Sequence, residues 1–324
     1  MKARVWFVLI GALCVAAGAG LALGPVHLPL TEVWAALMGR GSPDAIAIVQ
    51  ALRLPRLALG VTVGAGLGMS GAAMQATLRN PLAEPYLLGV SGGAAVGAVV
   101  AVTAHLTSPA LLPLAAFMGS VLAVVLVLLV ARASAAATDA RVLIMSGVVV
   151  GAFANAAIMV LLAGAPDDTV RGALWWMMGS LGDASWPLVA WIAGYVLLGG
   201  ILLLAQAREI ELLAVGDDPA AALGVDVARA TRRAFLVAAS LAAVTVAGAG
   251  LVGFVGLMVP ALARTLGARS ARVTMAAAAI IGGVLVVAAD VVARTARAPA
   301  ELPLGAVTAL VGVPFFLARL RSRA

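Results

Sequence analysis

Long apolar segments alternate with short polar ones along the whole chain. About 20 apolar residues are enough for a helix to cross a bilayer. Ten segments of this kind lie near residues 5–23, 57–77, 86–106, 110–131, 142–164, 187–206, 233–251, 252–267, 273–293 and 304–318. The stretch 233–267, which holds two of them, is the hardest to divide. The pattern predicts an all-α polytopic membrane protein with about ten transmembrane helices in a single domain, residues 1–324.

Glycines at every fourth position mark the stretch between Arg53 and Gly97. They are Gly60, Gly64 and Gly68 in one apolar segment and Gly89, Gly93 and Gly97 in the next, with the polar break Arg79-Asn80-Pro81 between the two segments. This spacing places small residues on one helix face, where neighbouring backbones approach closely in lipid. We therefore expect a tightly packed helical hairpin, in which an Asn-Pro turn ends the first helix.

Composition supports the membrane assignment. Hydrophobic residues make up 64% of the chain and charged residues 11%, and the mean hydropathy is +1.13. No soluble domain of this size has such a composition. The apolar run that ends at Leu23 is too long for a signal peptide, so we expect it to be the first helix. Cys14 is the only cysteine, which excludes an intrachain disulfide and a cysteine-rich metal site.

Basic residues set the expected orientation, because cytoplasmic loops of membrane proteins are enriched in Lys and Arg. With the amino terminus inside, ten spans leave only six of the 21 basic residues outside: Arg40, Arg53, Arg56, Arg171, Arg294 and Arg297. Both termini are therefore expected in the cytoplasm. Topology accounts for the net charge of +7, which gives no support to nucleic-acid binding.

Motifs that carry chemistry are scarce. Lys2 is the only lysine, which excludes a Gly-x-x-x-x-Gly-Lys-Ser/Thr phosphate loop and ATP hydrolysis by that route. Gly-x-Gly-x-x-Gly strings begin at Gly66 and Gly248, but both lie in apolar helical runs without a preceding strand, which favours helix packing over nucleotide binding. His27 and His105 lack paired ligand spacing, which favours interfacial histidines. We expect no catalytic residue, no metal site and no cofactor bound by this chain.

The longest hydrophilic interruption runs from Arg208 to Arg233 and holds five of the fourteen acidic residues. Asp218 before Pro219 is typical of a helix start with a capping carboxylate, and Gly224 is typical of a helix stop. We expect a short exposed helix between them. It is either part of a solvated loop or a docking element for a cytoplasmic partner, and composition leaves both interpretations open.

Several longer motifs carry a family resemblance that covers nearly the whole chain. They are Arg53-Leu54-Pro55-Arg56, Gly71-Ala72-Ala73-Met74-Gln75, Arg79-Asn80-Pro81-Leu82-Ala83-Glu84-Pro85, Leu88-Gly89-Val90-Ser91, Leu223-Gly224-Val225, Gly253-Phe254-Val255-Gly256-Leu257, Ala289-Asp290, Glu301-Leu302-Pro303-Leu304-Gly305 and Gly312-Val313-Pro314-Phe315-Phe316. The sequence resembles the permease subunits of type II ABC importers, the FecCD family, which moves cobalamin, haem and ferric siderophores. Ala261 is a departure, because the family commonly has histidine after the proline that is Pro260 here.

The resemblance implies a homodimer of ten-helix permeases in the bacterial inner membrane. It implies inverted repeats that relate spans two to five to spans seven to ten. Further implied features are a translocation path along the two-fold axis, two cytoplasmic ATPase subunits that use ATP and Mg, and a periplasmic substrate-binding protein. The trace of the repeat in this sequence is a glycine-rich span that ends at Pro81 and another that ends at Pro260.

The resemblance also assigns three roles to residues of this chain. It places ATPase coupling in the loop 209–226, on Leu212, Gly216, Asp217, Asp218, Pro219, Ala221, Leu223, Gly224 and Val225. It places binding-protein docking on Arg53, Arg56 and Arg294. The alternative for Arg294 is an ion pair with Asp290, four residues before it, whereas Arg53 and Arg56 have no acid close by in the sequence. It places the cytoplasmic gate on Asn80, Leu82, Thr138, Asp139 and Ala140.

The translocation path is expected to be mostly small and apolar, because a low-affinity path lets a bulky chelate leave. Candidate polar exceptions are Gln75, Ser91, Ser146 and Asn155. Nothing in the sequence marks the cargo, for which we slightly favour haem over cobalamin or a ferric siderophore. An ion-coupled secondary transporter needs ionisable groups within its spans, and only Asp290 comes near to that. An intramembrane enzyme needs a nucleophile or metal constellation, for which there is no candidate.

Overall fold

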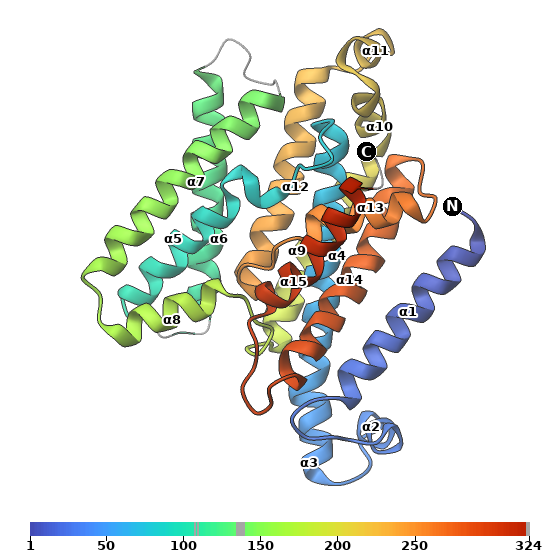
Figure 1. Ribbon diagram of the computed structural model, residues 1–324, viewed down its shortest axis with the longest axis vertical. Helices are drawn as coiled ribbons and strands as arrows, with labels where there is room; N and C mark the ends of the chain where they lie inside the picture. The colour runs from blue at the N-terminus through green and yellow to red at the C-terminus, as the bar shows by residue number, and fades with distance from the viewer. Residues whose placement is uncertain (107, 109, 134–139, 322–324) are drawn as a thin grey trace.

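The computed structural model describes residues 1–106, 108, 110–133 and 140–321, in which all regular secondary structure is helical (Figure 1). Seven helices are long and apolar enough to cross a membrane, and three shorter apolar helices accompany them. The ten are α1 (Ala3–Ala22), α4 (Leu54–Thr77), α5 (Val90–Thr103), α6 (Leu111–Arg132), α7 (Ala140–Ala163), α9 (Trp186–Ala205), α12 (Val227–Ala249), α13 (Val255–Thr265), α14 (Ala271–Thr295) and α15 (Leu304–Arg321). Each coincides with one predicted apolar segment, so the expected count of ten is confirmed.

Shorter helices, which the apolar pattern did not reveal, lie between these spans in the chain. They are α2 (Leu30–Leu37), α3 (Pro43–Ile46), the π-helix η1 (Ala47–Arg53), the 3₁₀-helix η2 (Pro85–Leu88), α8 (Asp167–Met177), α10 (Ala207–Val215) and α11 (Asp217–Ala222). Figure 1 shows α10 and α11 at one end, which we call the α11 end, and α2 and α3 at the other, which we call the α3 end. Helix α1 begins, and α15 ends, toward the α11 end.

Two of the ten helices are too short to cross a bilayer. Helices α5 and α13 have 14 and 11 residues, which at 1.5 Å per residue span only about 21 and 17 Å of a core about 30 Å thick. Both follow a residue in the left-handed region, Gly89 (φ +76°) before α5 and Phe254 (φ +66°) before α13. The chain segments leading into these helices are irregular, and they replace the missing helical turns.

These irregular segments satisfy their polar backbone groups by contacting each other. The backbone N–H of Phe254 donates to the Glu84 carboxylate at 2.9 Å, and the N–H of Val252 donates to the Tyr86 hydroxyl at 3.2 Å. Irregular backbone is tolerated at membrane depth only where the protein satisfies it. Because α5 is the third span and α13 the eighth, the two broken spans occupy corresponding places in the two halves, as an inverted repeat requires.

The glycine stripe of α4 forms the centre of the bundle. A Cβ atom added at Gly64 would lie 2.1 Å from the carbonyl oxygen of Gly282 on α14, and one added at Gly68 would lie 2.3 Å from that of Ala278 on the same helix. Backbone-to-backbone contact at these positions leaves no room for any side chain. The expectation of close glycine packing is therefore correct for the first stripe.

The second stripe packs in the same way, but the expected hairpin is wrong. Gly93 of α5 lies against Gly119 of α6, and Gly97 lies against Ala115. Helix α4 packs mainly on α14, α12, α13 and α9, whereas α5 packs on α6 and α7. The two arms have few contacts with each other because the irregular segment between them carries α5 away from α4 (Figure 1). Gly89 lies just before α5, where it supplies the left-handed turn and also lies against Gly147 and Val150 of α7.

Candidate functional site

Two short helices form the α11 end, where the sequence left a solvated loop and a docking element as alternatives. Helix α11 begins at Asp217 after Gly216 (φ +155°), and no side chain caps it. The expectation of Asp218 as the capping residue is therefore wrong by two residues, because the N-cap is Gly216. The backbone at this N-cap has a conformation that residues with a Cβ atom rarely adopt, so the position favours glycine. The predicted stop is correct, since Gly224 has φ +83°.

The α10–α11 segment has one packed side and one exposed side. Leu213 and Ala220 are buried together with Ala230 of α12, which fixes α11 on the end of the bundle. On the other side, Val215 is 70% and Leu223 64% exposed. Among the coupling residues proposed from sequence, the exposed ones are Asp217, Asp218, Pro219, Ala221, Leu223 and Gly224, and the half-buried ones are Leu212, Gly216 and Val225. Large apolar side chains beside exposed carboxylates make a surface suited to a protein partner.

The segment after α4, which we call the gate loop (79–82), lies beside this surface. Arg79, two residues after the end of α4, lies in the left-handed region (φ +49°), and the Asn80 side chain accepts a hydrogen bond from the N–H of Leu82 at 2.9 Å. The predicted Asn-Pro turn is thus present, and Leu82 is 47% exposed at its tip. Of the other proposed gate residues, Thr138 and Asp139 lie outside the described residues, and Ala140 is the first residue of α7.

An ion pair joins the gate loop to α11. The Arg79 guanidinium donates to the Asp217 carboxylate at 2.8 Å. The sequence gave no signal for this pair, because 138 residues separate its members. It connects a residue proposed for ATPase coupling with the loop proposed as the gate.

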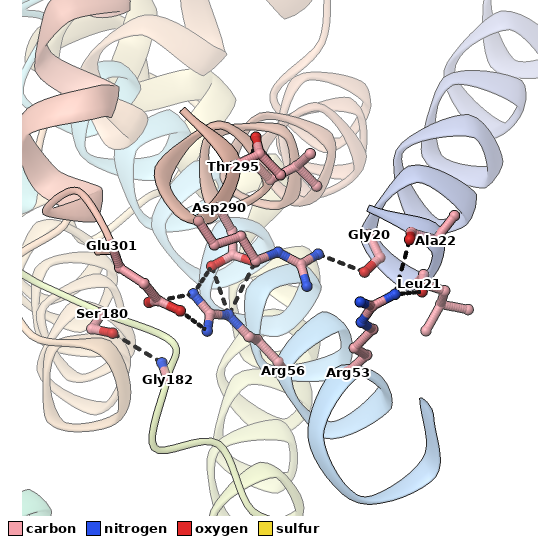
Figure 2. A network of polar contacts seen from close by, with 12 residues as sticks. Gly20, Leu21, Ala22, Arg53, Arg56, Ser180, Gly182, Asp290, Thr295 and Glu301 are labelled. Atoms are coloured by element: carbon pink, nitrogen blue, oxygen red, sulfur yellow. Dashed lines mark hydrogen bonds and ion pairs between the residues drawn. The ribbon is translucent and has the colours of Figure 1, made fainter. Parts of the chain in front are cut away.

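Three arginines, Arg53, Arg56 and Arg294, gather near the α3 end. Figure 2 shows Arg53 bonded to Leu21 and Ala22, and Arg56 between Asp290 and Glu301. Arg53 is only 5% exposed, and its guanidinium donates to the carbonyls of Leu21 and Ala22 at 2.6 and 2.9 Å. It also donates to the carbonyl of Val26. These bonds fix the turn that follows α1 against the start of α4, so this arginine holds the fold together.

Arg56 is the centre of the network (Figure 2). Its guanidinium donates to Asp290 at 2.8 and 2.9 Å and to both carboxylate oxygens of Glu301 at 2.8 Å. No acid lies close to Arg56 in the sequence, but α14 and the segment before α15 bring two acids to it in the folded chain. These hydrogen bonds also lower the pKa of Glu301 below its ordinary value.

Arg294 shares Asp290 with Arg56. Its Nε lies 3.3 Å from the Asp290 carboxylate, one turn before it on α14, which confirms the intrahelical ion pair proposed as the alternative. It also donates to the carbonyl of Gly20 on α1. Arg294 is 4% exposed. Of the three arginines, Arg56 alone has a side chain more than a tenth exposed, at 13%, and its partner Glu301 is 37% exposed.

The candidate polar residues of the path have different surroundings. Gln75 is 4% exposed, and its amide donates to the carbonyls of Gly256 and Leu257 at 3.3 and 3.0 Å. Ser91 donates to the carbonyl of Tyr86, Ser146 is buried, and Asn155 is exposed on α7. Within the described part of the chain, no three His, Cys, Asp or Glu side chains are arranged to hold a metal ion.

Comparison with known proteins identifies the family. The FecCD transport family matches residues 9–322. A cobalamin import system permease protein, BtuC of Halobacterium salinarum, is 42% identical over 91% of this chain and 79% of its own length. A hemin transport system permease protein, HmuU of Yersinia pestis, is 39% identical over 92% of this chain and 90% of its own length. A solved inward-facing structure of a metal-chelate type ABC transporter superposes with a TM-score of 0.89 at 27% identity, covering 99% of this chain and all of that one. The chain therefore belongs to the FecCD transport family and has the fold of a type II ABC importer permease.

Proposed function

We propose that this permease carries a metal chelate into the cell, driven by ATP hydrolysis on separate ATPase subunits that dock on α10 and α11. The observation that carries the proposal is the α10–α11 segment itself. It presents exposed Val215 and Leu223 beside exposed Asp217 and Asp218, and it is ion-paired to the gate loop. An ATPase that moves α11 would therefore also move the end of α4. The absence of any lysine after Lys2 supports the assignment of ATP and Mg to the partner.

The orientation follows from the basic residues. We place the α11 end in the cytoplasm, because Arg79, Arg208 and Arg269 belong to it together with most of the other cations, and cytoplasmic ends are enriched in arginine. Both termini are then cytoplasmic and the α3 end faces the periplasm. This corresponds to a bacterial inner-membrane protein, with the ATPases on the inner side and the chelate delivered from outside.

We place the translocation path between two copies of the chain. Helices α7 and α15 carry large exposed apolar side chains, such as Phe153 at 68% and Leu310 at 75%. These faces suit either lipid or a second copy, and the family resemblance supports a homodimer with its path along the two-fold axis. The proposed cytoplasmic gate then consists of Asn80 and Leu82 together with Thr138, Asp139 and Ala140 from both protomers.

For the periplasmic side, the proposal is that a chelate-loaded binding protein docks on the α3 end. The family resemblance assigns this contact to Arg53, Arg56 and Arg294. The three side chains differ in burial, so the proposal gives them different roles. Arg56 with Glu301 lies closest to the surface and could exchange partners with a docking carboxylate. Arg53 and Arg294 would act by holding the end of α1 and the start of α4 in position. Charged contacts of this kind guide association and fix register.

Haem is the first cargo we would test, with cobalamin and a ferric siderophore in parallel. Proteoliposomes would hold the permease with its ATPase and internal ATP, and haem-loaded binding protein would be added outside. ATP-dependent haem accumulation supports the complete proposal. If only another chelate accumulates, the haem assignment is wrong and the ATP-driven import mechanism still holds. Uptake that needs an ion gradient and no ATPase would indicate a secondary carrier and overturn the proposal.

A further inference from the structure

Helix α2 carries an apolar stripe that the fold leaves exposed. Leu30, Trp34 and Met38 are 65%, 64% and 56% exposed, and they occupy every fourth position, which places them on one face of the helix. The buried residues of α2, Val33 and Ala36, lie on another face. A helix that is apolar on both its packed and its exposed side is unsuited to water, because surface helices keep polar residues outside.

The packed side fixes α2 in place. Val33 and Ala36 belong to one core cluster with Leu21 and Ala22 of α1, and the Gln50 side-chain amide donates to the Ala36 carbonyl at 2.8 Å. Figure 1 shows α2 beside the end of α1. The helix cannot turn its stripe inward without breaking these contacts, so the stripe needs a partner outside the chain.

The depth of α2 in the membrane follows from α1. At 1.5 Å per residue, the 20 residues of α1 span about 30 Å, which is the thickness of the hydrocarbon core. The last turn of α1 therefore lies at the edge of the core. Arg53 and Arg294 reach the carbonyl groups of Leu21 and Gly20 in this turn, and charged side chains near helix ends lie at the membrane interface. Since α2 packs on the same turn, it lies at the level of the lipid headgroups.

The stripe also continues a surface that faces lipid. Phe7, Val8 and Val15 of α1 are exposed, as expected of a transmembrane helix on the outside of a bundle. Leu21, near the end of α1, is buried in the cluster with α2. After Val15, the next large apolar side chains exposed along the chain are Val26 and those of the stripe. At the edge of the core, α2 therefore replaces α1 as the lipid-facing surface.

Charge and aromatic content agree with this location. Glu32, the only charged residue within α2, is half-buried, and its carboxylate accepts the Ser42 hydroxyl at 3.4 Å. No charge therefore interrupts the stripe, and the exposed Arg40 follows the helix. Tryptophan, which stands at the centre of the stripe, is enriched at headgroup level because its ring is apolar and its N–H is polar. Leucine and tryptophan on the inserted face are typical of an interfacial helix.

We propose that α2 is an interfacial helix that inserts Leu30, Trp34 and Met38 into the lipid leaflet at the α3 end. The partner is the bilayer surface itself. Insertion holds the turn between α1 and α2 at a constant depth. The helical run of 35 residues from Pro43 to Thr77 is longer than the core requires, so α3 extends beyond the lipid. This role is independent of the cargo, of the ATPase and of the direction of transport.

Spin-label accessibility of the whole permease in nanodiscs tests the proposal. Single labels are attached at Leu30→Cys and Met38→Cys in a Cys14→Ser background, so that Trp34 stays in place. Native Cys14, exposed on α1, is the reference for lipid, and Asp44→Cys, at an exposed position of α3, is the reference for water. Oxygen concentrates in the bilayer and a nickel chelate stays in water. We expect the oxygen-to-nickel accessibility ratio at both test positions to be several-fold above that of Asp44→Cys and below that of Cys14.

Trp34 itself provides a second measurement. Lipids brominated near the headgroup quench tryptophans that lie at that depth. The fluorescence component lost in Trp34→Phe is expected to be quenched when the wild type is placed in brominated nanodiscs. The variant changes one exposed side chain, so the packed side of α2 stays intact.

Three results would overturn the interfacial helix. Accessibility ratios equal to that of Asp44→Cys, with no quenching of Trp34, would place the stripe in water. Nickel accessibility that falls only when a substrate-binding protein is added would make the stripe a protein-docking surface. Dipolar broadening between equivalent labels of two copies would make it a contact between protomers. Each of these results leaves the proposed transport function standing, because ATP-dependent uptake tests that function separately.

Discussion

The guanidinium of Arg79 and the carboxylate of Asp217 meet at 2.8 Å at the α11 end, across 138 residues of sequence. Arg79 lies two residues after the end of α4, the most central helix, and Asp217 is the first residue of α11. Both side chains are substantially exposed, at 39% and 55%. Pairs of this kind contribute at most about 1 kcal/mol to stability. The pair is therefore better suited to fixing the position of α11 relative to the gate loop than to holding the fold together.

We expect Arg79→Ala and Asp217→Ala each to lower chelate transport per ATP hydrolysed, while the melting temperature stays close to that of the wild type. The physical reason is that α11 would move without displacing the end of α4. The measurement is ATPase rate and uptake on the same proteoliposomes. The double variant should be no worse than either single one, and the charge swap Arg79→Asp with Asp217→Arg should recover part of the coupling. Independent, additive losses would show that the two residues act separately.

Glycine substitutions should separate packing from helix propensity. Gly64→Ala places a methyl group 2.1 Å from the Gly282 carbonyl oxygen, so α4 and α14 must move apart. Overpacking of a close-packed interior costs about 1–3 kcal/mol or more. Gly11→Ala on α1 meets nothing within 4 Å and should stabilise the helix by up to about 1 kcal/mol. Thermal unfolding in detergent compares the two variants. Equal changes in melting temperature would contradict the close contact between α4 and α14.

Removal of Arg56 should destabilise the α3 end strongly. Its side chain is 13% exposed and that of Asp290 is 6% exposed, and breaking a buried ion pair from one side costs about 3–5 kcal/mol. Arg56→Lys should fall in between, because lysine keeps the charge and loses the planar fork. Arg297→Ala, a change at an exposed arginine nearby, serves as the control. Denaturant unfolding of all three variants provides the ranking, and an Arg56→Ala protein as stable as the control would refute the structural role.

Acid should weaken the same network through Glu301. The hydrogen bonds from Arg56 lower the pKa of this carboxyl from its ordinary 4.5. Its stabilisation is therefore present above pH 4.5 and is lost as the pH falls through the lowered folded-state pKa. We expect the stability difference between wild type and Glu301→Gln to be largest near neutral pH and to shrink on acidification. Melting temperatures across an acidic pH series test this, and a difference that grows with acid would contradict the sign.

Glu84 should act as the cap of α13. Its carboxylate accepts the N–H of Phe254 at 2.9 Å, which Glu84→Gln can preserve through the amide oxygen. Glu84→Ala leaves that N–H unsatisfied, at a cost of about 1–3 kcal/mol. The measurement is the free energy of unfolding of the two variants. Tyr86→Phe probes the neighbouring hydrogen bond to Val252 in the same way. Equal stability of Glu84→Ala and Glu84→Gln would show that the contact has no energetic role.

The sequence by itself determined the features that depend on neighbours along the chain. The ten apolar segments, the glycine spacing around Gly64, the turn at Asn80 and the helix stop at Gly224 are all local patterns, because helix periodicity and backbone preferences act over a few residues. The family motifs added the expected partners and roles.

Only the tertiary structure decided which of these features meet. The stripe of α4 packs on α14 rather than on α5, Arg56 finds its acids on α14 and before α15, and Arg79 finds Asp217 on α11. Each pairing joins residues far apart in sequence, and the positions of the broken spans α5 and α13 govern where the helices lie. Close packing of whole helices sets those positions, and no local pattern specifies it, because a glycine or arginine has the same local preferences whatever lies opposite it.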